Sequence, residues 1–190
     1  YSGAVKEGNR KGISEQRPNP GVYLHPEYNA SQDQANDIAL IKLATPFVID
    51  PYIQTVAIPR APRPAGVVGT LASIDHLAPL PPGQFGIFRA PISPNNNDYQ
   101  PKFYITAAAA QSSLCPGDSG SGFVTVENGR ATVRGVASQG TITECKTPQG
   151  EAVFTDVFMH RAWILQTMGK DDATLAGNTR VRWSGQGTRG

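Results

Sequence analysis

Histidine, cysteine and charged residues are all scarce in this chain of 190 residues. Charged residues make up 17% of it and the net charge is +2, a balance that argues against a nucleic-acid-binding surface. Two cysteines without a CxxC pair exclude the common structural zinc sites and dithiol redox centres. No apolar run approaches the roughly 20 residues of a membrane-spanning helix. We therefore expect no metal, no cofactor, and neither nucleic acid nor membrane as a partner.

The two cysteines, Cys115 and Cys145, allow two interpretations. One disulfide bond between them is the simpler one and would place the protein in an oxidising compartment. Two buried free thiols are the alternative. The chain begins at Tyr1 rather than Met, so we expect an upstream segment to have been removed.

What the sequence does contain is a series of short runs rich in Val, Ile, Phe and Thr, separated by Gly, Pro and Asn. This pattern is typical of an all-β sandwich or barrel. The expected strands are Gly21–His25, Ile38–Leu43, Ile53–Ile58, Val67–Ile74, Phe85–Ile92, Phe103–Ala107, Gly122–Val126, Thr132–Ser138 and Ala152–Val157. Asn128-Gly129 predicts a type I′ hairpin turn. One helix is expected near His160–Met168, because its apolar residues recur at helical spacing.

The heptapeptide Cys-Pro-Gly-Asp-Ser-Gly-Ser at residues 115–121 has the composition of a nucleophile loop. Gly117 and Gly120 let the backbone turn tightly, and the amides of Gly117 and Ser119 can stabilise an oxyanion. Such a serine requires a histidine base and a carboxylate. Asp37, which precedes the apolar run Ile38–Leu43, is the candidate carboxylate. The competing interpretations are an ordinary turn for Ser119 and a turn or helix-capping role for Asp37.

Four stretches in the same order resemble trypsin- and chymotrypsin-like serine peptidases. Gly117–Ser121 resembles their nucleophile loop, and Leu24–Tyr28 followed by Asn36–Leu43 resembles the approach to their buried aspartate. Gly135–Gly140 resembles their substrate-binding strand. Ala152–Val157 followed by Trp163-Ile164 resembles their last strand and C-terminal helix. The resemblance extends over residues 1–168.

The resemblance implies an all-β fold of two six-stranded barrels with the active site in the cleft between them and a helix at the C-terminal end. Residues 1–58 would form part of the first barrel, which is incomplete in this chain. Residues 59–168 would form the second barrel with the helix, and residues 169–190 a C-terminal extension.

The resemblance also assigns roles to individual residues. Ser119 becomes the nucleophile, Asp37 orients the histidine, and Gly117 contributes to the oxyanion hole. Asp118 resembles the aspartate that pairs with the new N-terminal amine after zymogen cleavage. Cys115 and Cys145 resemble a disulfide that bridges the specificity pocket. The pocket itself would be lined by Ser113, Ser138, Gln139, Gly140 and Ala152.

Ser113 would form the floor of the pocket. Because Ser113 is neutral, the resemblance does not support a preference for Lys or Arg substrates. We expect a preference for medium to large apolar residues before the scissile bond.

The family's histidine-bearing segment has no counterpart in this sequence. The histidines present, His25, His76 and His160, do not match the position of the base. One explanation is a secreted serine endopeptidase whose histidine lies on an N-terminal chain produced by proteolytic nicking of the same precursor. A second is a catalytically inactive homologue that acts as a binding module. A third keeps the same machinery for esters or small amides.

Overall fold

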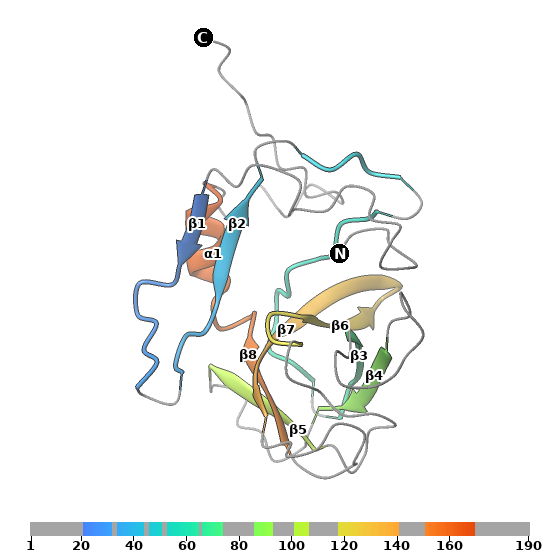
Figure 1. Cartoon of the computed structure of the whole chain (residues 1–190). Coiled ribbons are helices and arrows are strands. Elements are labelled where there is room, and N and C mark those ends of the chain that lie inside the picture. Colours follow the sequence, from blue (N-terminus) through green and yellow to red (C-terminus); the bar gives the residue numbers. More distant parts are fainter. Residues whose placement is uncertain are drawn as a thin grey trace.

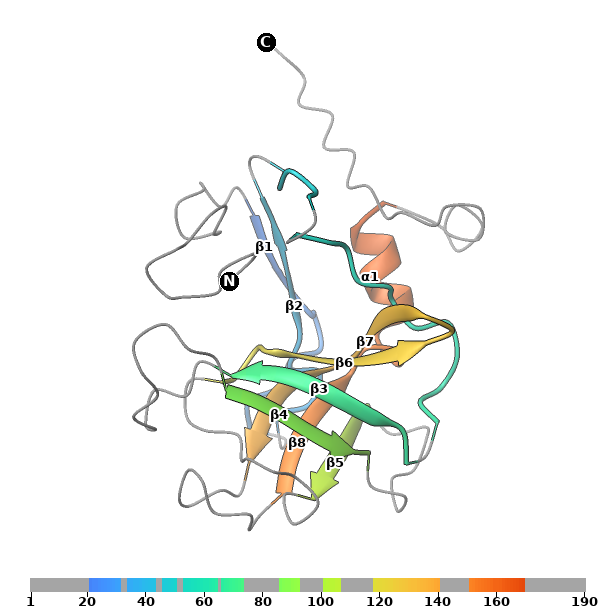
Figure 2. The same cartoon turned by 90° about the vertical axis from the view of Figure 1, so that its right-hand side faces the viewer.

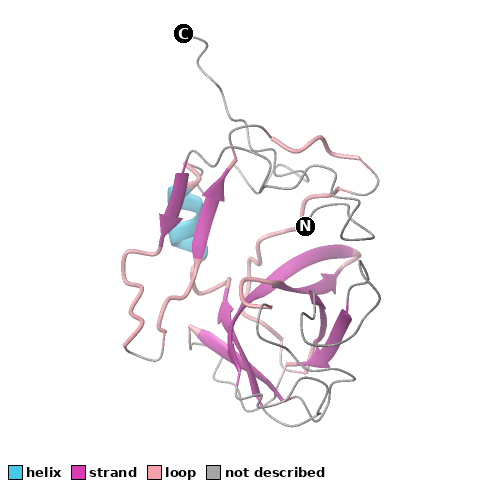
Figure 3. Cartoon of the chain, viewed as in Figure 1, coloured by secondary structure: helices cyan, strands magenta, loops and turns pink. Residues whose placement is uncertain are grey.

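The computed structural model describes residues 21–31, 34–43, 46–50, 53–64, 66–73, 86–92, 101–106, 118–140 and 151–169. These residues form strands and one short helix, so the all-β class with a C-terminal helix is confirmed (Figure 3). Strands β1 (Gly21–Leu24) and β2 (Ala39–Lys42) pair antiparallel in a two-stranded sheet. Helix α1 (Arg161–Thr167) lies beside this sheet (Figures 1 and 2).

The remaining strands form a six-stranded antiparallel sheet. In spatial order they are β4 (Gly86–Pro91), β3 (Val68–Ser73), β6 (Gly122–Glu127), β7 (Arg130–Gly140), β8 (Glu151–Asp156) and β5 (Lys102–Thr106). The outermost strands, β4 and β5, approach each other to within 8 Å between Cα atoms, so the sheet curls toward a barrel. Its long central strand β7 passes between this barrel and the two-stranded sheet (Figure 1).

The expected strands overlap β1 to β8, with one exception. The segment 53–58 forms no strand, so the prediction for Ile53–Ile58 is wrong. Only Ala57 reaches the larger sheet, where its N–H donates to the Ala131 carbonyl (2.9 Å) and its carbonyl accepts from the Val133 N–H (3.0 Å). Pro59 follows two residues later and has no N–H with which to extend a ladder.

The hairpin between β6 and β7 turns at Asn128 and Gly129 as predicted. Asn128 has φ +50° and Gly129 has φ +73°, and positive φ at both central residues defines the type I′ turn. This turn sets the register in which β7 leaves β6, and β7 carries much of the candidate site.

Three phenylalanines form the centre of the barrel core. Phe103, Phe123 and Phe154 have no exposed surface, and the Phe103 and Phe154 rings stack at 5.2 Å between centroids. Two glycines make room for these rings. A Cβ atom on Gly69 would lie 2.2 Å from the Phe123 ring, and one on Gly135 would lie 2.5 Å from the Phe103 ring. The backbone can approach the rings this closely only where there is no side chain.

A smaller apolar cluster joins the two-stranded sheet to α1. Ile38, Val157 and Ile164 are buried in it, and Leu40 and Trp163 pack against it. The opposite face of the two-stranded sheet carries Val22, Leu24 and Ile41, which are 53%, 66% and 54% exposed. We call these three residues the open face. The division at residues 58 and 168 into two barrels and an extension stays a prediction.

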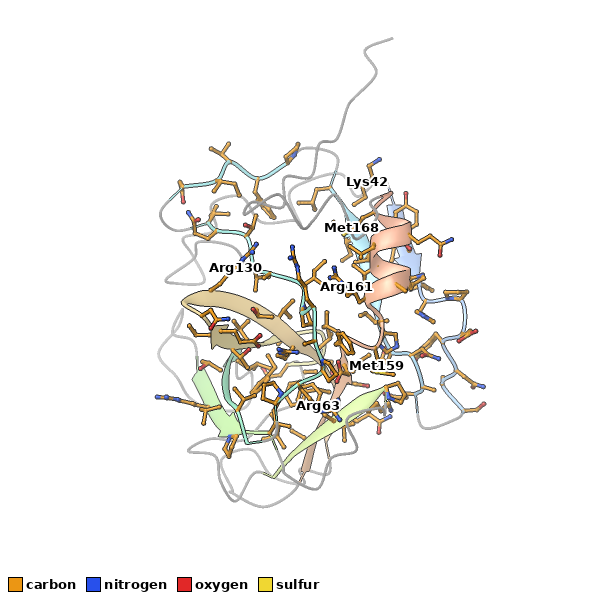
Figure 4. All side chains as sticks on the ribbon, turned by 180° about the vertical axis from the view of Figure 1, so that it is seen from behind. Lys42, Arg63, Arg130, Met159, Arg161 and Met168 are labelled. Atoms are coloured by element: carbon orange, nitrogen blue, oxygen red, sulfur yellow. The ribbon has the colours of Figure 1, made fainter. Side chains whose placement is uncertain are left out.

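A buried ion pair fastens the segment 59–64 to the end of β8. Arg63 pairs with the Asp156 carboxylate, both side chains are 1% exposed, and the Arg63 guanidinium lies 5.3 Å from the centre of the Phe103 ring. The second carboxylate oxygen of Asp156 accepts from the Phe158 N–H (2.8 Å). Figure 4 shows both Arg63 and Met159 below α1. This ion pair sets the path by which the chain passes from one sheet to the other.

Candidate active site

Ser119 occupies an exposed turn at the start of β6. The Ser121 N–H donates to the Asp118 carbonyl (3.0 Å), which closes a four-residue turn with Ser119 and Gly120 at its centre. Gly120 has φ +84°, a conformation that glycine adopts without strain and that places it third in a type II-like turn. The turn leaves the Ser119 side chain facing solvent, accessible to a substrate.

Asp37 lies half-buried just before β2 and is held by the larger sheet. The Ser138 hydroxyl donates to one carboxylate oxygen of Asp37 at 2.7 Å. The Thr155 hydroxyl donates to the Asp37 backbone carbonyl at 2.9 Å. Because the side chain and the main chain of Asp37 are both bonded to the same sheet, the direction of its carboxylate is fixed.

A β-bulge explains why Ser138 reaches Asp37. Ala137 pairs with Phe154 and Gln139 pairs with Val153, so Ser138 is an extra residue between two paired positions of β7. A bulged residue leaves the regular alternation of the strand and turns its side chain in a new direction. Sequence analysis placed Ser138 only in the substrate pocket, and its bond to Asp37 was not foreseen.

The serine turn is attached to the residue beside Ser138. The Gly120 N–H donates to the Ala137 carbonyl (2.8 Å), and the Ala137 N–H donates to the Ser121 carbonyl (2.9 Å). Ala137 therefore holds the turn that carries Ser119, and Ser138 holds Asp37. The Ser119 turn and Asp37, which are distant in sequence, are thus attached to consecutive residues of β7.

The described residues include only some of the predicted site. Gly117, Ser113, Cys115 and Cys145 lie outside the described residues, so the oxyanion hole, the pocket floor and the disulfide stay predictions. Asp118 is buried, at 2% exposure. Gln139 and Gly140 end β7, whereas Ala152 has no exposed surface and packs in the phenylalanine core.

The two described histidines, His25 and His160, lie against each other beside α1. The His25 and His160 rings meet edge to face at 5.2 Å between centroids, and His25 also contacts Trp163 at 4.9 Å. Burial first, and then the positive charge of His160, lower the pKa of His25, while Glu27 raises it in part. Within the described part of the chain, no hydrogen bond joins a histidine ring to the Asp37 carboxylate or the Ser119 hydroxyl.

Neither a metal centre nor a membrane-spanning helix is found among the described residues. No group of three or more His, Cys, Asp or Glu side chains in them is placed to hold a metal ion. None of their helices is long and apolar enough to cross a membrane.

The sequence matches known proteins over most of its length. The trypsin family model matches residues 2–164. The chain belongs to the trypsin family. Trypsin-2 of Salmo salar is 32% identical over 175 residues, covering 86% of this chain and 71% of that protein. Trypsin-1 of the same species is also 32% identical, with 86% and 67% covered.

A solved structure shows the same fold. The chain of kallikrein-related peptidase 10 superposes with a TM-score of 0.63 at 21% identity, covering 80% of this chain and 73% of that chain. The chymotrypsin-like architecture expected from the motifs is therefore confirmed. As a member of the trypsin family, the chain is a serine-type endopeptidase.

Proposed function

We propose that this chain hydrolyses peptide bonds with Ser119 as the nucleophile and Asp37 as the residue that orients a histidine base. The attachment of the Ser119 turn to Ala137, next to the residue that binds Asp37, supports this proposal most directly. A triad needs its members within reach of one imidazole, and this arrangement brings the serine and the carboxylate to one strand.

The reaction follows from the roles of these groups. The histidine takes the proton of the Ser119 hydroxyl as its oxygen attacks the substrate carbonyl carbon. The carbonyl oxygen becomes an oxyanion, which the amides of Gly117 and Ser119 stabilise. The imidazolium then gives its proton to the leaving amine, and the Asp37 carboxylate holds the ring in position. Water hydrolyses the resulting acyl-enzyme by the same steps.

The histidine, in this proposal, lies on an N-terminal chain of the same precursor. The open face supports it, because Val22, Leu24 and Ile41 leave a row of apolar side chains exposed on a sheet of two strands. Sheets of this kind are rarely stable without a further layer or further strands. An N-terminal segment that adds strands at the edges of β1 and β2 and curls the sheet into a barrel would bury the open face and bring its histidine to Asp37.

The specificity and location are also proposals. A neutral Ser113 at the pocket floor, with Ser138, Gln139 and Gly140 along one side, favours an apolar residue before the scissile bond. Ala152 packs in the phenylalanine core, so we leave it out of this proposed lining. A disulfide between Cys115 and Cys145, secretion, and proteolytic processing complete the proposal.

Labelling with a fluorophosphonate tests the nucleophile. We expect the active protein to be labelled once, at Ser119, and to cleave peptides after apolar residues faster than after Lys or Arg. Ser119→Ala should abolish both signals. Ser121→Ala is the matched control and should retain them, because Ser121 contributes its backbone to the turn.

Intact mass spectrometry under denaturing conditions tests the second chain. We expect a companion polypeptide that carries a histidine. Absence of both the companion and the labelling would favour the inactive homologue that acts as a binding module.

A further inference from the structure

His160 is a buried histidine whose two ring nitrogens both face oxygen atoms. Its ring is 4% exposed, at the start of α1. Its Nδ1 lies 2.7 Å from the Asp156 backbone carbonyl oxygen, and its Nε2 lies 3.0 Å from Oδ1 of Asn36. A carbonyl oxygen only accepts hydrogen bonds, so the first contact requires a proton on Nδ1.

The second contact requires a proton on Nε2 as well. The side-chain amide of Asn36 donates from Nδ2 to the Glu27 backbone carbonyl at 3.0 Å. Turning this amide over would place its oxygen against the Glu27 carbonyl, so the Glu27 contact fixes which atom faces His160. With Oδ1 toward the ring, Nε2 must donate. A neutral imidazole carries one N–H and satisfies one of the two oxygens, whereas an imidazolium satisfies both.

We propose that His160 is a positioning residue for the candidate active site, acting as an imidazolium that holds Asn36 and, through it, the backbone of Asp37. This inference rests on the proposed function for its link to catalysis. Its protonation state can be measured without any assay of activity.

The backbone conformation at Asn36 sets the position of Asp37, so the contacts that fix Asn36 also fix Asp37. Asn36 has φ +55°, in the left-handed region that asparagine tolerates better than most residues. Its carbonyl accepts from the Ile38 N–H at 2.8 Å, so the chain reverses tightly around Asp37. Glu27 and His160 bind the Asn36 side chain from opposite sides. Ser138 and Thr155 bind the following residue, Asp37, so hydrogen bonds hold both Asn36 and Asp37.

The charged groups around His160 are compatible with a positive ring. The His25 ring meets the His160 ring edge to face, and burial followed by His160 lowers the pKa of His25, which favours its neutral form. From the turn after β1 comes Glu27, and from β8 the Asp156 carboxylate, which is paired with Arg63. Asp37 follows Asn36 directly, and its carboxylate is bound by Ser138.

Nitrogen-15 NMR of the histidine rings in the full protein tests the proposal directly. At neutral pH we expect protons on both His160 ring nitrogens, because each nitrogen faces an oxygen that only accepts. A His160 ring with one unprotonated nitrogen at neutral pH would overturn the proposal.

Substitutions at Asn36 separate the hydrogen bond from the backbone conformation. Asn36→Gly keeps the positive φ and removes the acceptor, so the N–H on Nε2 of His160 loses its partner. In the active protein the same variant should lower kcat about tenfold with KM unchanged. Asn36→Asp keeps an oxygen toward the ring but loses the donor to the Glu27 carbonyl, so its kcat should lie between those of Asn36→Gly and the unsubstituted protein.

His25→Phe is the matched control. It keeps an aromatic ring against Trp163 and removes the neighbouring titration, so it should leave kcat and the double protonation of His160 unchanged. Equal kcat for Asn36→Gly and the unsubstituted protein would overturn the positioning role. A protein with doubly protonated His160 but no peptidase activity would instead count against the proposed function.

Discussion

The two sheets of this protein differ in how completely they bury their apolar side chains. The six-stranded sheet encloses Phe103, Phe123 and Phe154 without exposed surface. The two-stranded sheet buries one face against α1 and exposes the open face, where Leu24 is 66% exposed. The larger sheet therefore has a core of its own, whereas the smaller one depends on what packs against it.

This difference has a functional side. Asp37 lies beside the smaller sheet, but its bonds run to Ser138 and Thr155 of the larger one. The six-stranded sheet therefore holds Asp37, the candidate catalytic residue that lies next to the two-stranded sheet. We infer that β7 and β8 position the residues of the candidate site.

The largest expected effect tests whether both halves contribute to one site. Asp37→Asn removes the negative charge that stabilises the imidazolium, so kcat of the active protein should fall by roughly 10⁴-fold. Asp50→Asn, an exposed aspartate outside the site, is the control and should leave kcat unchanged. Peptide hydrolysis kinetics measure both. If Asp37→Asn lowered kcat tenfold or less, Asp37 and the smaller sheet beside it would not contribute to catalysis as proposed.

Large-to-small substitutions test the difference in burial. Phe154→Ala opens a cavity in the barrel core and should lower the free energy of unfolding by about 3–5 kcal/mol. Leu24→Ala on the open face should change it by less than about 0.5 kcal/mol. Chemical denaturation of the chain measures both. If an N-terminal segment covers the open face, Leu24→Ala should become more destabilising in its presence.

Glycine substitutions sharpen the same comparison within the larger sheet. Gly135→Ala places a methyl group against the Phe103 ring and should destabilise the protein by about 1–3 kcal/mol. Gly122→Ala is matched to it, because its Cβ atom would lie 3.5 Å from Val133, an ordinary contact. Thermal unfolding should show a clear loss for the first variant and little for the second. Similar losses for both would mean that the rings are not closely packed against Gly135.

The smallest effect concerns pH. The hydrogen bond from Arg134 lowers the pKa of Glu127 below 4.5, and burial opposes this in part. An acid with a lowered pKa stabilises the folded state above its unfolded pKa, and this stabilisation is lost as pH falls through the folded pKa. Glu127→Gln should therefore reduce the pH dependence of the melting temperature below about pH 4.5. An unchanged acid profile would contradict this assignment.

Local patterns in the sequence were enough for most of the fold. Alternating apolar runs identified the strands because each strand of the barrel buries one face, and Asn128-Gly129 identified its hairpin because few residues accept positive φ. Ile53–Ile58 has a similar composition but forms no strand. Only Ala57 bridges to β7, and one bridge does not make a strand.

The candidate site was predictable only in part. Ser119 and Asp37 stand in local motifs, so the sequence indicated both. The bond from Ser138 to Asp37 joins residues 101 apart, and the bond from His160 to Asn36 joins residues 124 apart. Both depend on a bulge in β7 and on where α1 packs, which no local pattern encodes. Proline clusters marked the segment 59–64 as a connection, but nothing indicated that Arg63 is buried against Asp156.

Ala137 and Ser138 are joined by one peptide unit, whose ends lie about 3.8 Å apart whatever the state of the surrounding core. Covalent geometry therefore fixes the distance between Ala137, which binds the Ser119 turn, and Ser138, which binds Asp37. Substitutions in the barrel core would lower the free energy of unfolding before they changed the spacing between Ala137 and Ser138. An insertion of a single residue between Ala137 and Ser138 would change this spacing directly, together with the register of Gln139 and Gly140 against β8.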